Sequence, residues 1–115
     1  MKTLKYHNKK TEVDGITFDS KAEGRRYGEL KTMQRAGLIH GLESQPEFPL
    51  IVGGVPIKFR CGKGWKMRKY VADFRYVDAA GMTIVEDVKG VLTEAYKLKR
   101  DIVRAMVVVI TEITR

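Results

Sequence analysis

Three residues near the middle of the chain have types and a spacing that could hold a divalent metal ion. Asp73 lies in one expected strand, and Asp87 and Lys89 lie in the next. Side chains alternate along a strand, so Asp87 and Lys89 share one face. If the intervening loop makes Val77 face Thr83, then Asp73 falls opposite Asp87. Two carboxylates and a lysine would then lie close together on adjacent strands.

Two carboxylates at that separation cannot both stay ionised without a compensating charge. Mg²⁺, or Mn²⁺ in its place, supplies that charge and suits a site of one or two carboxylates completed by water and phosphate oxygens. The metal would lower the pKa of a bound water, and Lys89 could orient that water or stabilise the developing anion. This arrangement is suited to phosphodiester hydrolysis. An Asp-x-Lys on a strand is nevertheless, by itself, more often a surface ion pair.

Two further acids bear on the identity of the metal ligands. Glu23 falls inside the apolar stripe of an expected helix, at capping-box spacing from Ser20, so it is either a third acid of the metal site or a helix cap. The apolar neighbours favour the metal site. Glu86 competes with Asp87, but strand alternation places Glu86 on the opposite face, and Lys89 follows Asp87 by the two residues expected of an acid-x-lysine pair. A β-bulge between the two acids would reverse this choice.

The charge distribution indicates a polyanionic partner. The 115-residue chain has 22 Lys and Arg against 14 Asp and Glu, a net charge of +8, which points most commonly to nucleic acid. Residues 58–69 contain no acid, and their basic residues alternate with aromatic ones, as phosphate contact combined with base stacking would require. The alternative is a solvated hairpin whose Trp65 packs on the body of the protein. The predicted DNA-binding residues are Lys58, Arg60, Lys63, Trp65, Lys66, Arg68, Lys69 and Lys99.

Composition excludes several classes of protein. One cysteine, Cys61, rules out an internal disulfide or a cysteine-rich zinc site. The longest apolar runs are too short to cross a membrane, and the charged start lacks the apolar core of a signal peptide. We therefore expect a single domain over residues 1–115 that acts in the cytoplasm and does not bind membranes.

The hydrophobic pattern predicts the elements that would position these residues. A mixed α/β sheet with helices on its faces follows from antiparallel strands, a crossover helix and a last strand. The expected elements are a hairpin over 10–18 that turns at Asp14-Gly15, a helix from Ser20 to Gly37, extended segments over 38–42 and 45–51, a strand over 55–60, a turn over 61–65, strands over 69–77 and 82–89 joined by a turn, a helix over 93–104 capped by Thr93, and a strand over 107–113.

A helical wheel assigns the faces of the first expected helix. Its apolar face contains Tyr27 and Leu30 together with Ala22 and Met33. Gly24 falls among the residues that point the other way, and we therefore expect it on the solvent side.

Taken in order, these segments resemble the signature of the PD-(D/E)XK restriction-endonuclease-like superfamily. Ala72-Asp73-Phe74 and the run from Glu86 to Gly90 match its two acidic strands, with Ala72 in place of the usual proline, and Ser20 to Glu23 matches its first-helix glutamate. More narrowly, the chain resembles a family of small phage-encoded proteins of uncharacterised function assigned to that superfamily. The further matching segments are Asp14-Gly15-Ile16, Gln45-Pro46, Tyr70 and Tyr96 to Lys99.

The resemblance implies an αβββαβ core, a divalent metal and DNA cleavage. It makes Asp73, Asp87, Lys89 and Glu23 the catalytic set, with Asp73, Asp87 and Glu23 as the metal ligands. The expected activity is a structure-selective or nicking endonuclease in phage DNA replication, recombination or packaging, and a homodimer is compatible with it. The alternatives are a non-catalytic DNA-binding module that keeps the fold and a regulator whose basic hairpin docks an acidic protein.

Overall fold

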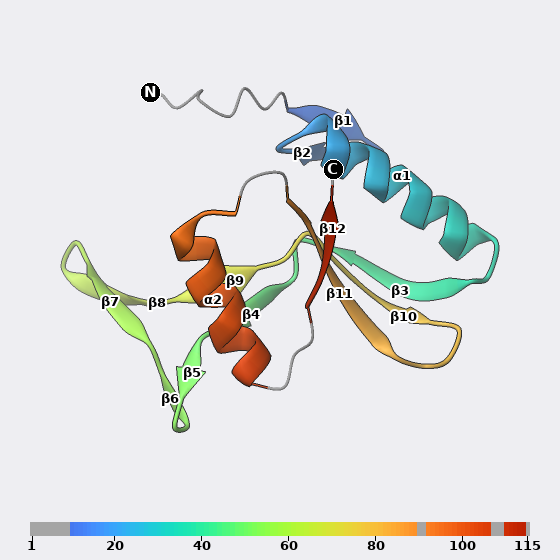
Figure 1. Ribbon diagram of the computed structural model, residues 1–115. Coiled ribbons are helices and arrows are strands. Elements are labelled where there is room, and N and C mark those ends of the chain that lie inside the picture. The colour runs from blue at the N-terminus through green and yellow to red at the C-terminus, as the bar shows by residue number, and fades with distance from the viewer. Residues whose placement is uncertain (1–9, 90–91, 107–109, 115) are drawn as a thin grey trace.

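The computed structural model describes residues 10–89, 92–106 and 110–114 (Figure 1), and the side chains of Lys89 and Thr114 lie outside the described part. The chain is a mixed α/β protein with two helices, as expected. Neither helix within these ranges is long and apolar enough to cross a membrane. The elements are β1 Thr11–Val13, β2 Ile16–Phe18, α1 Lys21–Arg35, β3 Ile39–Ser44, β4 Glu47–Pro49, β5 Ile51–Val52, β6 Val55–Pro56, β7 Lys58–Cys61, β8 Gly64–Met67, β9 Lys69–Val71, β10 Phe74–Asp78, β11 Thr83–Lys89, α2 Glu94–Ala105 and β12 Ile110–Thr114.

A four-stranded mixed sheet in the order β12-β11-β10-β3 forms the centre of the molecule. β10 runs antiparallel to both of its neighbours, whereas β11 and β12 are parallel. α2 provides the crossover between the parallel pair, which is the connection that parallel neighbours require. The mixed sheet was predicted correctly. Residues 107–109 of the expected last strand lie outside the described residues.

The two helices cover opposite faces of this sheet, and β11 contributes alternate side chains to each face. Val88 belongs to the buried cluster that Tyr27 and Leu30 of α1 complete. Val85 belongs to the other cluster, with Val103 of α2. Because both faces are covered, β11 is buried from Val85 to Val88, which explains why it reads as an apolar strand interrupted by acids.

The limits of α1 are those that the sequence predicts. Ser20 is the N-cap residue, and its side chain accepts a hydrogen bond from the Glu23 backbone N–H at 3.2 Å. Such a cap stabilises a helix by about 1 kcal/mol. At the other end, Gly37 has a φ of +79°, and the Leu38 N–H donates to the Met33 carbonyl at 3.0 Å. The left-handed glycine therefore closes the helix, as expected.

Gly24 departs from the helical-wheel expectation. It is buried rather than exposed, because the β1–β2 hairpin packs on this side of α1. A Cβ at this position would lie 3.1 Å from Cγ2 of Thr11. The glycine therefore allows the hairpin to approach the helix, and a contact of this kind cannot be read from the periodicity of one helix.

The strand expected over 69–77 is broken into β9 and β10 at Ala72-Asp73. The segment that pairs with these two strands is also interrupted, at Gln45-Pro46 between β3 and β4. Pro46 has no N–H to continue the ladder, and Gln45 adopts a left-handed φ of +57°. The Gln45 N–H donates to the Asp73 carbonyl at 2.9 Å, and the Ala72 N–H donates to the Pro46 carbonyl at 3.1 Å. Asp73 therefore lies at a bend shared by two strands.

Two short hairpins follow β4, and β7–β8 projects from the body as an arm (Figure 1). The single strand expected over 55–60 is wrong, because the chain changes partner at Ile57. Its N–H donates to the Leu50 carbonyl at 2.8 Å, and its carbonyl accepts from the Arg68 N–H at 2.7 Å. The expected turn over 61–65 is also tighter than predicted, since Cys61 pairs with Gly64.

Candidate metal centre and nucleic-acid interface

Asp73 lies against the middle of the Asp87-Val88-Lys89 segment. Its Oδ2 accepts a hydrogen bond from the Val88 backbone N–H at 2.6 Å, and its own N–H donates to the Glu86 carbonyl at 3.0 Å. The β10–β11 ladder ends at the pair of Phe74 with Glu86, so Asp73 lies at the bend just before β10 and beside the Asp87-Val88-Lys89 segment. The register also pairs Val77 with Thr83, as the prediction required, whereas the direct opposition of Asp73 to Asp87 stays a prediction.

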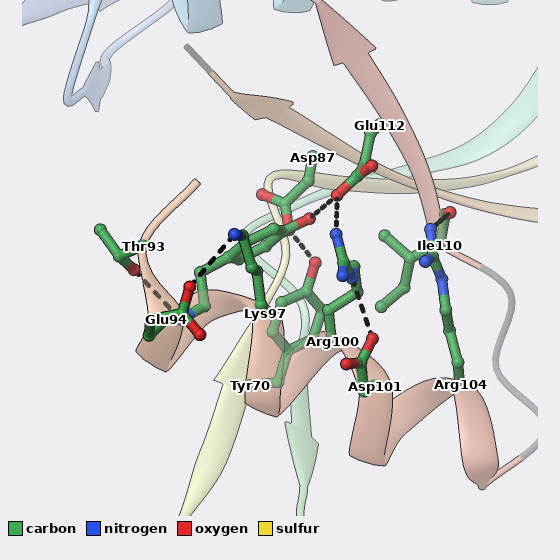
Figure 2. Close-up of polar contacts among 11 residues, drawn as sticks. Tyr70, Asp87, Thr93, Glu94, Lys97, Arg100, Asp101, Arg104, Ile110 and Glu112 are labelled. Carbon is green, nitrogen blue, oxygen red and sulfur yellow. Dashed lines mark hydrogen bonds and ion pairs between the residues drawn. The ribbon is translucent and has the colours of Figure 1, made fainter. Parts of the chain in front are cut away.

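Asp87 is fully buried on the face of the sheet that α2 covers. Val85, two residues earlier, packs in the cluster of that face. The Tyr70 hydroxyl, which comes from β9, donates to Oδ2 of Asp87 (Figure 2). A charge-assisted bond of this kind fixes the carboxylate in a surrounding of low dielectric. Sequence reasoning did not predict this role for Tyr70, because the bend at Ala72-Asp73 lies between Tyr70 and β10.

Glu86 points to the opposite face, where α1 holds it. Its carboxylate accepts from Nε of Arg26 at 2.8 Å and from Nη2 at 2.6 Å, and also from the Tyr76 hydroxyl. Burial, together with the bond to Glu86, raises the pKa of Tyr76 to about 12. The hydrogen bonds that Arg26 donates to Glu86 raise the pKa of Arg26. Pairing along β11 continues through both acids without a bulge, so the predicted separation of Glu86 from Asp87 is confirmed.

A second acid, Glu112 of β12, lies beside Asp87. The parallel register pairs these two residues directly. Oε2 of Glu112 accepts from the Tyr96 hydroxyl at 2.9 Å. It also accepts from Nη1 of Arg100 at 2.9 Å (Figure 2). The bond from Arg100 lowers the pKa of Glu112, whereas burial raises the pKa of Tyr96. Sequence reasoning missed Glu112 and Arg100, because only the parallel register brings them to this face.

The other two predicted catalytic residues are Glu23 and Lys89. Glu23 belongs to α1 and forms part of the helix cap, with Oε2 accepting from Oγ of Ser20 at 3.4 Å. The backbone of Lys89 ends β11, and its side chain lies outside the described part of the chain. Within residues 10–89, 92–106 and 110–114, no three His, Cys, Asp or Glu side chains gather into a group that could hold a metal ion.

The donors present nevertheless fit a hard divalent cation. Asp73 at the bend and Asp87 in β11 offer carboxylate oxygens, the donor type that Mg²⁺ and Mn²⁺ prefer. Asp73 is only half-buried, so this side of the pair faces a route to solvent. Two protein carboxylates, with water and substrate phosphate as the remaining ligands, are a usual complement for Mg²⁺.

A concave surface lies beside the arm and has a volume of about 840 Å³. We call it the arm hollow, and it is bounded by β4, β7, β8, β9 and α2. Trp65 is 62% exposed, so the alternative in which it packs on the body is wrong. Five of the predicted DNA-binding residues line the hollow: Trp65, Lys66, Arg68, Lys69 and Lys99. The other three, Lys58, Arg60 and Lys63, lie outside its lining.

Cations and aromatic rings are paired within and around the arm hollow. The Arg68 guanidinium lies over the Phe59 ring, 4.1 Å from its centroid, and that of Arg60 lies 5.5 Å from the Trp65 ring centre. Nζ of Lys69 forms an ion pair with Glu47 at 2.9 Å. Aromatic rings in such contacts keep one guanidinium close to their face, which concentrates positive charge on the arm.

Comparison with known proteins gives one match. A family model described as "Protein of unknown function (DUF1064)" matches residues 3–112. No curated protein and no solved structure matches the chain. The matched residues include both candidate aspartates, the arm and α2. Because the model covers nearly the whole sequence, this chain belongs to the DUF1064 family of proteins of unknown function.

Proposed function

We propose that the protein is a metal-dependent DNA endonuclease of the PD-(D/E)XK type. The observation that carries the proposal is the contact between the Asp73 carboxylate and the Val88 N–H, which joins the first acid to the acid-x-lysine segment. The order α1, β3, β10, β11, α2 and β12, with β11 and β12 parallel, supports it further. It is the order of elements that the αβββαβ core would have, with hairpins inserted between β3 and β10.

Each candidate residue would have a distinct task. Asp73 and Asp87 would hold Mg²⁺ or Mn²⁺, and a bound metal supplies an acidic water and charge neutralisation at the phosphate. Tyr70 keeps the Asp87 carboxylate in place through its hydroxyl. Lys89, which strand alternation predicts on the same face as Asp87, would orient the attacking water or stabilise charge on the phosphate oxygens. The arm would bind the DNA backbone, with phage DNA replication, recombination or packaging as the setting that the sequence resemblance suggests.

A second candidate is a non-catalytic DNA-binding module with a nuclease-like fold. Two observations favour it: the described residues contain no three-acid metal group, and the Asp87 side chain is fully buried beneath α2. In that case the arm hollow would bind DNA, and the buried carboxylates would serve only the packing of α2 on the sheet.

Cleavage assays separate the two candidates. The purified chain would be incubated with linear, nicked, flapped and four-way DNA in Mg²⁺ or Mn²⁺, with excess EDTA as the control. The endonuclease predicts metal-dependent products from at least one of these substrates. Binding to every substrate without products in either metal would leave the non-catalytic module as the better account. Cleavage in excess EDTA would overturn the metal mechanism.

A further inference from the structure

The arm hollow combines exposed apolar side chains with cations. Trp65, Met67 and Val71 are 62%, 45% and 43% exposed, and all three line the hollow. Apolar side chains gathered with a few polar groups in a concave surface are typical of a binding site. The volume of about 840 Å³ is within the range of clefts that enclose a drug-sized ligand. The hollow is thus large enough to receive flat rings against its apolar side chains.

The cations of the hollow come from two separate elements. Lys66 belongs to β8 on the arm, and Lys99 belongs to α2 on the body. Among the described residues, no carboxylate forms an ion pair with either of them. Lys69 is the exception on this surface, since Glu47 pairs with it. Positive charges on both sides of an apolar surface are complementary to a polymer that has a negatively charged backbone and flat aromatic rings.

This combination distinguishes single-stranded from double-stranded DNA. A duplex keeps its bases stacked on one another and presents phosphates, sugars and base edges to a protein. The face of an exposed tryptophan would then meet charged or polar groups. An unpaired strand offers free base faces, on which aromatic side chains stack at a gain of about 1–3 kcal/mol per base. The ring of Trp65 therefore has a stacking partner in a single strand that an intact duplex does not offer.

We infer that the arm hollow is a binding site for single-stranded DNA, with Trp65 as the platform on which a base stacks. This inference rests on the proposed function only for its connection to cleavage. β9 and α2 make that connection, because they carry residues of both sites. Lys69 and Val71 line the hollow while Tyr70 between them reaches Asp87. Lys99 lines the hollow while Arg100 beside it binds Glu112. The substrate class would be DNA with an unpaired segment, such as a flap.

The chain contains one tryptophan, so its fluorescence reports on this site alone. Titration with oligo(dT) of about 12 nucleotides, in EDTA to prevent cleavage, should quench Trp65 and saturate. A duplex of the same length should bind more weakly, with little quenching. Trp65→Ala should weaken oligo(dT) binding, measured by anisotropy of a labelled strand, by about 5- to 150-fold. Trp65→Tyr should restore most of the affinity, because a ring is retained.

Met82→Ala is the matched control, since Met82 is 61% exposed in the β10–β11 turn and lies outside the hollow; it should bind as the wild type does. Thermal melts would show that each variant folds. Equal affinity for duplex and oligo(dT), or no loss in Trp65→Ala, would overturn the inference. Equal quenching by polyglutamate would also overturn it, in favour of an acidic protein partner. Because these measurements are made without metal, a failed cleavage assay leaves the inference standing.

Discussion

The carboxylate of Asp73 accepts a hydrogen bond from the backbone N–H of Val88 at 2.6 Å. A side-chain oxygen thus serves as the acceptor for the Val88 N–H in place of a backbone carbonyl, while the Asp73 carbonyl accepts from the Gln45 N–H. The bend at Asp73 makes this exchange possible. It turns an acid of one strand toward the central residue of the acid-x-lysine segment in the next.

This contact gives Asp73 two separable roles, one in folding and one in metal binding. Asp73→Asn keeps an oxygen that can accept the Val88 N–H, but it removes the charge that a metal needs. We expect it to fold like the wild type and to cleave DNA more slowly, by more than the roughly 10- to 100-fold loss typical of residues that only support metal ligands.

Asp73→Ala loses both roles and should melt earlier as well. Single-turnover cleavage and thermal melts of the two variants, side by side, would check this. Wild-type cleavage by Asp73→Asn would contradict the assignment of Asp73 as a ligand.

The neighbouring acids Glu86 and Asp87 should respond differently to neutralisation. Glu86→Gln weakens a buried ion pair with Arg26, and breaking such pairs costs about 3–5 kcal/mol. Glu86 faces away from the candidate site, so the cleavage rate of the folded Glu86→Gln variant should remain substantial. Asp87→Asn should lose nearly all cleavage. The measurements are urea unfolding and single-turnover cleavage at saturating Mg²⁺. If the Glu86→Gln variant cleaves DNA more slowly than the Asp87→Asn variant, Glu86 is the metal ligand and the assignment of Asp87 is wrong.

Basic residues of the arm should contact phosphates whatever the DNA sequence. Replacing Lys63, Lys66 and Lys69 together with Gln should weaken binding to all sequences. The slope of log affinity against log salt should fall by about 2–3, at roughly 0.9 per lost contact.

The control for this triple variant removes the same charge from α1, which packs on the other face of the sheet: Arg25, Lys31 and Arg35 to Gln. Its slope should stay close to that of the wild type. An equal change in both triple variants would mean that net charge, and not the arm, sets the affinity.

The Glu112–Arg100 pair should stabilise the fold in a pH-dependent way. Arg100 holds the pKa of Glu112 below its ordinary value of 4.5. A carboxyl group whose pKa is lowered in the folded state stabilises the fold at pH values above its unfolded pKa. This stabilisation is lost as the pH falls through the folded-state pKa.

Glu112→Gln should therefore be less stable than the wild type near neutral pH, and the difference should shrink below about pH 4.5. Urea unfolding from about pH 6 to about pH 3 would measure it. A constant difference would show that the pair acts through packing alone.

Much of the fold was predictable because it depends on local periodicity and turn chemistry. The cap at Ser20, the stop at Gly37 and the α2 cap at Thr93 are all where the sequence predicts them. The turn between β10 and β11 fixes their register, and strand alternation then separates Asp87 from Glu86. These features involve residues close in the sequence, so their geometry follows from the residues themselves.

Tertiary structure decided what depends on contacts between distant segments. The break at Asp73 needs a second chain that bends at Gln45-Pro46, and the burial of Gly24 needs a hairpin packed on the helix. Glu112 reaches Asp87 only through a parallel register set by the α2 crossover. Lys99 joins the arm hollow only because α2 packs beside β9. Local periodicity and turn chemistry do not reveal which distant segments pair, because many chain paths bring similar apolar faces together with similar free energy.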